Sequence, residues 1–328
     1  MAAPMSQAEV DAMMEEAFAL LEAGEPEQAM TIGRRLETLR FSGGFEIQAL
    51  AYQNMGENGE AIRVLEKGAK RVADVWLLWQ LLGNCLSDEG RFDEALTAYD
   101  TAIDLPQSDR VSMQFNRATA LWRGERLDEA NAIIAQLLGD PVFAGSKPEL
   151  KVQIHAARIG NLSDLGLHQG AIAYFDSLPD PEEWSEYPAE TAWLETKYAI
   201  ALWRAERGED ANKVLACAIQ RDKTNAGAQW LKREMRQRGD PVDTNSYDLL
   251  IHGPWHADVF PEAGPAEGFF TRYQVMADDL DEALTFVREF EAPDIRDALE
   301  IEEVEAQERC AVPKGVYWTS DYNFYEED

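Results

Sequence analysis

The stretch WQLLGNCLSDEGRFDEALTAYDTAIDLP, from Trp79 to Pro106, decides the fold of this chain. Its first half places four apolar or small residues on one helical face, at the spacing i, i+3, i+4 and i+7: Trp79, Leu82, Gly83 and Leu86. After a turn at Gly90, its second half does the same with Ala95, Tyr99 and Ala102. The small residues Gly83 and Ala95 allow two helices to approach closely, and Pro106 ends the second one. The stretch therefore predicts a tight helical hairpin.

The same hairpin pattern recurs along the chain. The small residue of the second helix returns at steps of 32, 34, 35, 41 and 40 residues: Ala29, Ala61, Ala95, Ala130, Ala171 and Ala211. A partner in the first helix lies twelve residues upstream each time: Ala17, Ala49, Gly83, Ala118, Ile159 and Ala199. A helical bundle without repeats is the alternative, but a bundle has no reason to repeat every 34 or so residues with matching turns.

These residues resemble the tetratricopeptide repeat, whose period is about 34 residues. The resemblance covers residues 8–239 and implies a mostly α chain, with an α-solenoid of about six helical hairpins. The two long steps predict Pro-rich insertions, GDPVFAGSKPE and SLPDPEEWSEYPAE, and TNAGAQWLKREMRQRG predicts a closing helix. The family resemblance also implies a non-catalytic adaptor that binds a protein or peptide partner.

Composition limits the other functions. The net charge of -31 argues against a nucleic-acid partner, because phosphate contacts need clustered Lys and Arg. No apolar stretch is long enough for a membrane span, and the first residues lack the features of a secretory signal, so we expect a cytoplasmic protein without a membrane partner. The three cysteines are far apart and lack metal-ligand spacing, and Cys85 and Cys217 are interpreted as small core residues.

Residues 240–328 differ in charge and pattern. They hold 23 acidic and 5 basic residues, a net charge of -18, which predicts a domain boundary near Gly239. SYDLLIHG, GFFTRYQVMA, LEIEEVEAQERC and GVYWTSDYNFYEED read as strands. DDLDEALTFVREFE, between the second and third, reads as an amphipathic helix with an Asp278 or Asp279 N-cap. The order predicts a small acidic α+β domain with an antiparallel sheet and one helix.

The inner helices of such repeats line a concave surface. The positions expected on that surface are Gln53, Asn54, Gln80, Asn84, Asp88, Phe115, Asn116, Thr119, Trp122, Arg123, Trp193, Thr196, Trp203 and Arg204. Asn, Gln and Arg can hydrogen-bond a peptide backbone, and Trp and Arg are frequent in binding hot spots. A clamp for chaperone carboxylates is not expected, because Gln80 and Ser112 stand where that clamp has lysines.

The segment LWRGER (residues 121–126) recurs in similar form as LWRAER (residues 202–207). This places Trp122–Arg123 and Trp203–Arg204 at equivalent positions of two hairpins. These arginines could hold a ligand carboxylate. In the alternative interpretation both tryptophans pack between hairpins, and the arginines pair with Glu125 and Glu206.

A metal or cofactor site is not predicted. His252 and His256 are weak candidates, with Asp258 and Glu262 nearby, but Gly253–Pro254 prevents the helix that would bring both rings to one face. We read them as polar residues of a turn. A second function stays open beside the adaptor: an acidic immunity or inhibitor protein that neutralises a basic toxin or nuclease through residues 240–328.

Overall fold

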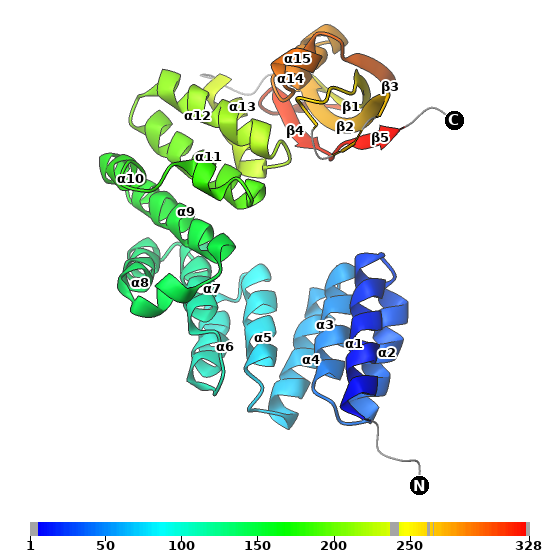
Figure 1. The fold of residues 1–328 in the computed structure, drawn as a ribbon, viewed down its shortest axis with the longest axis vertical. Helices are drawn as coiled ribbons and strands as arrows, with labels where there is room; N and C mark the ends of the chain where they lie inside the picture. The colour runs from blue at the N-terminus through cyan, green and yellow to red at the C-terminus, as the bar shows by residue number, and fades with distance from the viewer. Residues whose placement is uncertain (1–5, 237–242, 261–262, 265, 326–328) are drawn as a thin grey trace. The chain divides into compact units, whose positions relative to one another are not determined.

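The computed structural model describes residues 6–236, 243–260, 263–264 and 266–325. Their packing divides the chain into two compact units, residues 1–146 (unit 1) and residues 147–328 (unit 2). Figure 1 shows helices through most of the chain and a sheet near its C-terminus. None of the described helices is long and apolar enough to cross a membrane.

Unit 1 consists of four helical hairpins. In chain order its helices are α1 (Gln7–Glu22), α2 (Pro26–Thr38), α3 (Gly43–Asn54), α4 (Asn58–Arg71), α5 (Trp76–Asp88), α6 (Phe92–Asp104), α7 (Arg110–Arg123) and α8 (Leu127–Gly139). A 3-10 turn, η1 (Pro141–Gly145), follows in the first predicted insertion. The odd-numbered members are the first helices of the hairpins, and we call them the inner helices.

Each hairpin depends on a turn and on a close helix approach. The turn of the third hairpin uses Gly90 at φ +72°, a left-handed conformation that costs glycine nothing. In the fourth hairpin Glu125 adopts φ +60° at the corresponding place. A Cβ added at Gly83 would lie 2.5 Å from Cε1 of Tyr99, so the two helices of the third hairpin approach as closely as the small residue predicts.

Unit 2 begins with two more hairpins and a closing helix. These are α9 (Pro148–Asp164), α10 (His168–Phe175), α11 (Pro188–Arg204), α12 (Gly208–Arg221) and α13 (Ala226–Arg236), with the 3-10 turn η2 (Pro181–Trp184) in the second insertion. The predicted six hairpins, both insertions and the closing helix are confirmed.

The rest of unit 2 is a small sheet with helices. Its elements are β1 (Asp243–Pro254), β2 (Gly268–Ala277), α14 (Leu280–Arg288), α15 (Pro293–Arg296), β3 (Glu300–Ala311), β4 (Gly315–Thr319) and β5 (Asn323–Tyr325). The described strands run antiparallel in the order β3-β1-β2-β4, and β5 pairs with β2. Asp279 caps α14 by accepting from the backbone of Glu282. The predicted α+β fold is confirmed, with the short α15 as an additional helix.

The sheet and the last hairpin share one hydrophobic core. Leu249 of β1 and Phe269 of β2 are fully buried in the same cluster as Leu215 of α12 and Leu231 of α13. Gly239, where the sequence predicts a domain boundary, lies outside the described residues. The division into domains at 239/240 stays a prediction.

The cysteines follow the sequence interpretation only in part. Cys85 is fully buried in the core of unit 1, as predicted. The prediction for Cys217 is wrong, because this residue is exposed. Cys217 lies two residues after the fully buried Leu215, and two residues along a helix turn a side chain to a different face.

Candidate functional site

A hollow of about 320 Å³ lies on the inner helices of unit 1, and we call it the inner hollow. Three successive inner helices, α3, α5 and α7, supply most of its lining, and the outer helix α6 contributes Tyr99. The lining residues are Gln53, Asn84, Ser87, Asp88, Tyr99, Asn116, Thr119 and Arg123. Six of them are among the residues expected on the concave surface: Gln53, Asn84, Asp88, Asn116, Thr119 and Arg123.

Asn84 is oriented by two hydrogen bonds at the centre of the inner hollow. Its Oδ1 accepts from the hydroxyl of Tyr99 at 2.9 Å and from Nδ2 of Asn116 at 3.3 Å. Burial raises the pKa of Tyr99, so its hydroxyl stays protonated and donates to Asn84. Within the described part of the chain, Nδ2 of Asn84 and Oδ1 of Asn116 have no hydrogen-bond partner. The network therefore presents one donor and one acceptor side by side.

Arg123 is held by the preceding inner helix. Its Nη1 lies 2.7 Å from Oδ1 of Asp88 and 3.2 Å from Oγ of Ser87, both at the end of α5. The alternative sequence interpretation, which paired this arginine with Glu125, is wrong. Glu125 belongs to the turn after α7, whereas Asp88 lies on the neighbouring inner helix, within reach of the guanidinium.

The same arrangement recurs in unit 2. Nη1 of Arg204 lies 2.5 Å from Oδ1 of Asp164 and 3.2 Å from Oγ of Ser163, so its expected pairing with Glu206 is also wrong. The sequence contains the signal: LSDEG (residues 86–90) and LSDLG (residues 162–166) each precede one of the two LWR segments. Each Ser-Asp pair and the arginine of the next hairpin therefore form a repeated contact between successive inner helices.

The two tryptophans beside these arginines differ in their surroundings. Trp122 is 38% exposed. Trp203 is half-buried, packs against the hydrophobic clusters of unit 2, and meets Trp230 edge to face with ring centroids 6.2 Å apart. The packing alternative therefore holds for Trp203, while Trp122 keeps substantial contact with solvent.

The other predicted residues also occupy different environments. Asn54 is exposed, but its amide donates to the backbone oxygen of Leu21 at 3.1 Å and so satisfies the end of α1. Gln80 and Phe115 are half-buried on α5 and α7. Thr196 is only 1% exposed, so its expected place on an open surface is wrong. A Cβ at Gly227 would lie 3.3 Å from Cγ2 of Thr196, which shows that α13 covers this side chain.

Comparison with known proteins agrees with this geometry. Residues 48–109 and 86–141 each match the family described as tetratricopeptide repeat. Residues 48–141 carry tetratricopeptide repeats. No curated protein matches it at a significant level.

Solved structures with tetratricopeptide repeats resemble this chain in fold alone. A tetratricopeptide repeat protein from Parabacteroides merdae is 11% identical over 69% of this chain and 85% of its own, with a TM-score of 0.53. PilF of Pseudomonas aeruginosa is 14% identical over 69% of this chain and 97% of its own, with a TM-score of 0.48. YrrB, described as a TPR protein with an unusual peptide-binding site, is 15% identical over 61% of this chain and 96% of its own, with a TM-score of 0.41.

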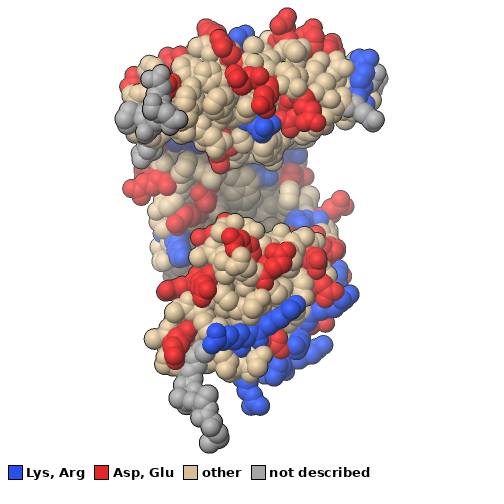
Figure 2. Space-filling model, turned by 90° about the vertical axis from the view of Figure 1, so that its right-hand side faces the viewer, with Lys and Arg blue, Asp and Glu red and all other residues tan. Residues whose placement is uncertain are grey.

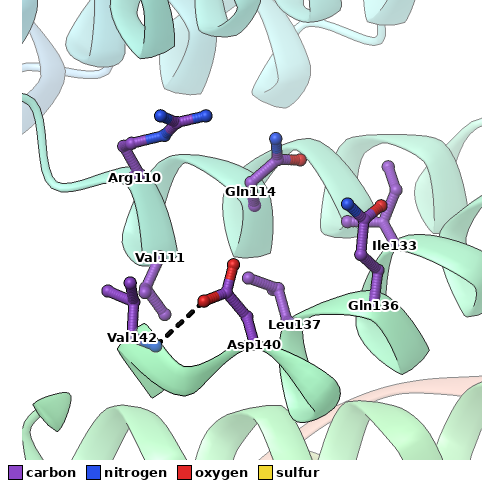
Figure 3. Close-up of a pocket in the computed structure, with 8 residues that line it drawn as sticks. All are labelled: Arg110, Val111, Gln114, Ile133, Gln136, Leu137, Asp140 and Val142. Atoms are coloured by element: carbon purple, nitrogen blue, oxygen red, sulfur yellow. Dashed lines mark hydrogen bonds between the residues drawn. The ribbon is translucent and has the colours of Figure 1, made fainter. Parts of the chain in front are cut away.

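A second hollow, of about 210 Å³, lies between the two helices of the fourth tetratricopeptide repeat. Figure 3 shows Arg110 and Gln114 of α7 on one side and Gln136 and Leu137 of α8 on the other. The carboxylate of Asp140 accepts from the backbone of Val142 at 2.9 Å and so holds the start of η1. The α7–α8 hollow involves one repeat only, whereas the inner hollow joins three.

The two histidine candidates lie outside the repeats. His252 belongs to strand β1, as the predicted strand SYDLLIHG requires, so it does not lie in a turn; its Nε2 lies 2.8 Å from the hydroxyl of Tyr325. His256 is exposed, and its Nδ1 accepts from the backbone of Asp258 at 3.3 Å. Glu262 lies outside the described residues. Among the residues that the structure does describe, no three His, Cys, Asp or Glu side chains form a group able to hold a metal ion.

Sequence reasoning omitted Glu46 of α3 from the candidate residues. It lies seven residues before Gln53, which is two helical turns and therefore the same face of α3. The equivalent position on α5 is Gln80, 34 residues after Glu46, and the equivalent position on α7 is Ser112, 32 residues after Gln80. The repeat period could therefore have identified Glu46 as an inner-face residue.

Proposed function

We propose that this protein is a non-catalytic adaptor that holds an extended peptide segment of a partner protein in the inner hollow of unit 1. The observation that carries the proposal is the oriented pair of Asn84 Nδ2 and Asn116 Oδ1. A peptide unit presents one carbonyl acceptor and one N–H donor, and this pair offers the complementary donor and acceptor.

The surroundings of the pair support the same function. Helical repeats stack into surfaces that bind extended partners, and the lining comes from three consecutive repeats. Tyr99 and Asn116 hold the Asn84 amide in place before a ligand arrives, so little side-chain freedom is lost on binding. Contacts to the backbone of a peptide are independent of its sequence, so specificity must come from other residues of the surface.

Two variants test this proposal without removing the fold. Asn84→Asp keeps the acceptor that Tyr99 and Asn116 use but replaces the outward donor, and Asn116→Ala removes the acceptor. The matched control is Gln28→Ala, an exposed amide on the outer helix α2. Affinity purification and mass spectrometry with the full chain should recover partners with the wild type and the control. Both inner-hollow variants should lose them. Identical partner sets for all four proteins would contradict the proposal.

A second candidate function uses the acidic part of unit 2. The edge strand β3 carries Glu300, Glu302, Glu303 and Glu305, and all four are exposed. Such a strand would attract a basic protein, as an inhibitor of a basic toxin or nuclease requires. The test is a variant with Gln at these four positions. If this second function holds, the partners of this variant should differ from those of the wild type, while Asn84→Asp should keep the wild-type partners.

A further inference from the structure

Three of the four inner helices of unit 1 carry no positive charge, and the fourth carries no unpaired cation that faces the inner hollow. α1, α3 and α5 contain no Lys or Arg at all. On α7, Arg117 lies 2.9 Å from Asp100, and Arg123 is paired with Asp88. Arg110, the third arginine of α7, lines the separate α7–α8 hollow.

The positive charges of the first two repeats belong mainly to their outer helices. Figure 2 shows Lys and Arg gathered on the part of unit 1 near the N-terminus. The exposed cations of α2 and α4 and their flanks are Arg34, Arg35, Arg40, Arg63, Lys67, Lys70 and Arg71. A ligand in the inner hollow therefore meets no unpaired lysine or arginine among the described residues that line it.

Glu46 is a carboxylate without a partner on this inner face. It is half-buried, and no hydrogen bond or ion pair joins it to any residue that the structure describes. Loss of hydration on burial raises the pKa of Glu46. A partly desolvated carboxylate of this kind is stabilised when a cation reaches it.

We propose that the ligand of the inner hollow is a basic extended peptide segment. One of its Lys or Arg side chains pairs with Glu46, and Asn84 and Asn116 hold the backbone of the segment. This inference rests on the proposed peptide-binding function. The helical rise of 1.5 Å per residue places Glu46 about 10 Å from Gln53 along α3. An extended peptide covers that length in about three residues. The basic residue of the ligand therefore lies about three positions from the residue that contacts Gln53.

The charge of the whole molecule favours the same class of ligand. A net charge of -31 attracts a basic segment over a longer range than the direct contacts and repels an acidic one. Asp88, which lines the inner hollow itself, contributes a second carboxylate that it shares with Arg123. An acidic ligand would place its carboxylates near Glu46 and Asp88 with only one cation, already bonded, to receive them.

A peptide array tests the inferred ligand class. The full chain is applied to synthetic 12-residue peptides that carry Lys or Arg, Asp or Glu, or only neutral residues at varied positions. The strongest basic peptide is then titrated by fluorescence polarisation against the wild type, Glu46→Gln, and the control Asp104→Asn. Asp104 is exposed on the outer helix α6 and has no partner among the described residues, so the control removes the same charge elsewhere.

The expected result is enrichment of basic peptides, with about fivefold weaker binding for Glu46→Gln and no change for Asp104→Asn. Preference for neutral or acidic peptides, or equal loss in both variants, would overturn the inference while leaving the inner hollow as a peptide site. Binding that Asn116→Ala, which changes no charge, does not weaken would instead reject the proposed function itself. The two failures are therefore distinguishable.

Discussion

The ammonium of Lys223 lies 3.1 Å from the carboxylate of Glu291, and both side chains are almost completely buried in unit 2. Lys223 also donates to the hydroxyl of Thr271 at 3.0 Å, and its Nζ lies 3.3 Å from the ring centroid of Tyr322. The hydroxyls of Tyr273 and Tyr322 donate to the two oxygens of Glu291. This cluster joins the turn between α12 and α13 to the sheet.

Removal of one partner should destabilise unit 2 strongly. Lys223→Met leaves the Glu291 carboxylate buried without its cation, which should cost about 3 kcal/mol of unfolding free energy. Urea denaturation followed by tryptophan fluorescence measures this change. The control Lys213→Met replaces an exposed lysine of α12 and should stay within about 0.5 kcal/mol of the wild type.

The double variant Lys223→Met/Glu291→Gln separates a buried charge effect from simple loss of packing. The neutral amide introduced at position 291 still accepts a hydrogen bond from a tyrosine hydroxyl and leaves no buried charge. The double variant should therefore be more stable than Lys223→Met alone. A loss equal to the sum of the losses of Lys223→Met and Glu291→Gln alone would show that the pair is not coupled.

His155 should make unit 2 less stable in mild acid. Nδ1 of His155 lies 2.7 Å from the Tyr174 hydroxyl, and its ring stacks on Trp184. Burial in these surroundings lowers the pKa of His155 from about 6.5 to about 4. Between these values the unfolded chain binds a proton that the folded chain does not. Stability therefore falls as the pH drops from 6.5 to 4, by on the order of 2 kcal/mol. Unfolding free energies of the wild type and His155→Phe across this range should show a smaller slope for the variant.

Two glycines of unit 1 should respond to alanine with opposite signs. Gly83→Ala should cost about 2 kcal/mol, because its new Cβ would overlap the ring of the buried Tyr99. Gly59→Ala, in the first turn of α4, has nothing within 4 Å and should add up to about 1 kcal/mol through helix propensity. Thermal unfolding followed by circular dichroism measures both. A neutral Gly83→Ala would contradict the close approach of α5 and α6.

Arg123→Gln should strengthen the binding of a basic peptide. The Arg123–Asp88 pair is partly exposed, so its loss should cost less than about 1 kcal/mol of stability. Asp88 then becomes available to the ligand, and affinity for the best basic peptide should rise about threefold. The equivalent variant in unit 2, Arg204→Gln, lies outside the inner hollow and should leave this affinity unchanged. Weaker binding by Arg123→Gln would show that the guanidinium itself contacts the ligand.

The candidate site could be predicted only in outline from the sequence. Repeat spacing placed Gln53, Asn84, Asn116 and Arg123 on the inner face, and the structure groups these four around one hollow. The orientation of Asn84 depends on Tyr99, fifteen residues away on another helix. No local pattern encodes that contact.

The sequence by itself determined the helical hairpins, their number, both insertions and the order of strands and helices near the C-terminus. These features follow from helical periodicity, strand patterns, turn residues and small residues at close approaches, which act within one hairpin or element. Only the tertiary structure decided that Arg123 and Arg204 pair with Asp88 and Asp164. It also decided that Thr196 is covered and that Lys223 meets Glu291 in a buried cluster. These ion pairs join residues 35 to 68 positions apart, so they depend on which helix faces meet after the repeats have stacked.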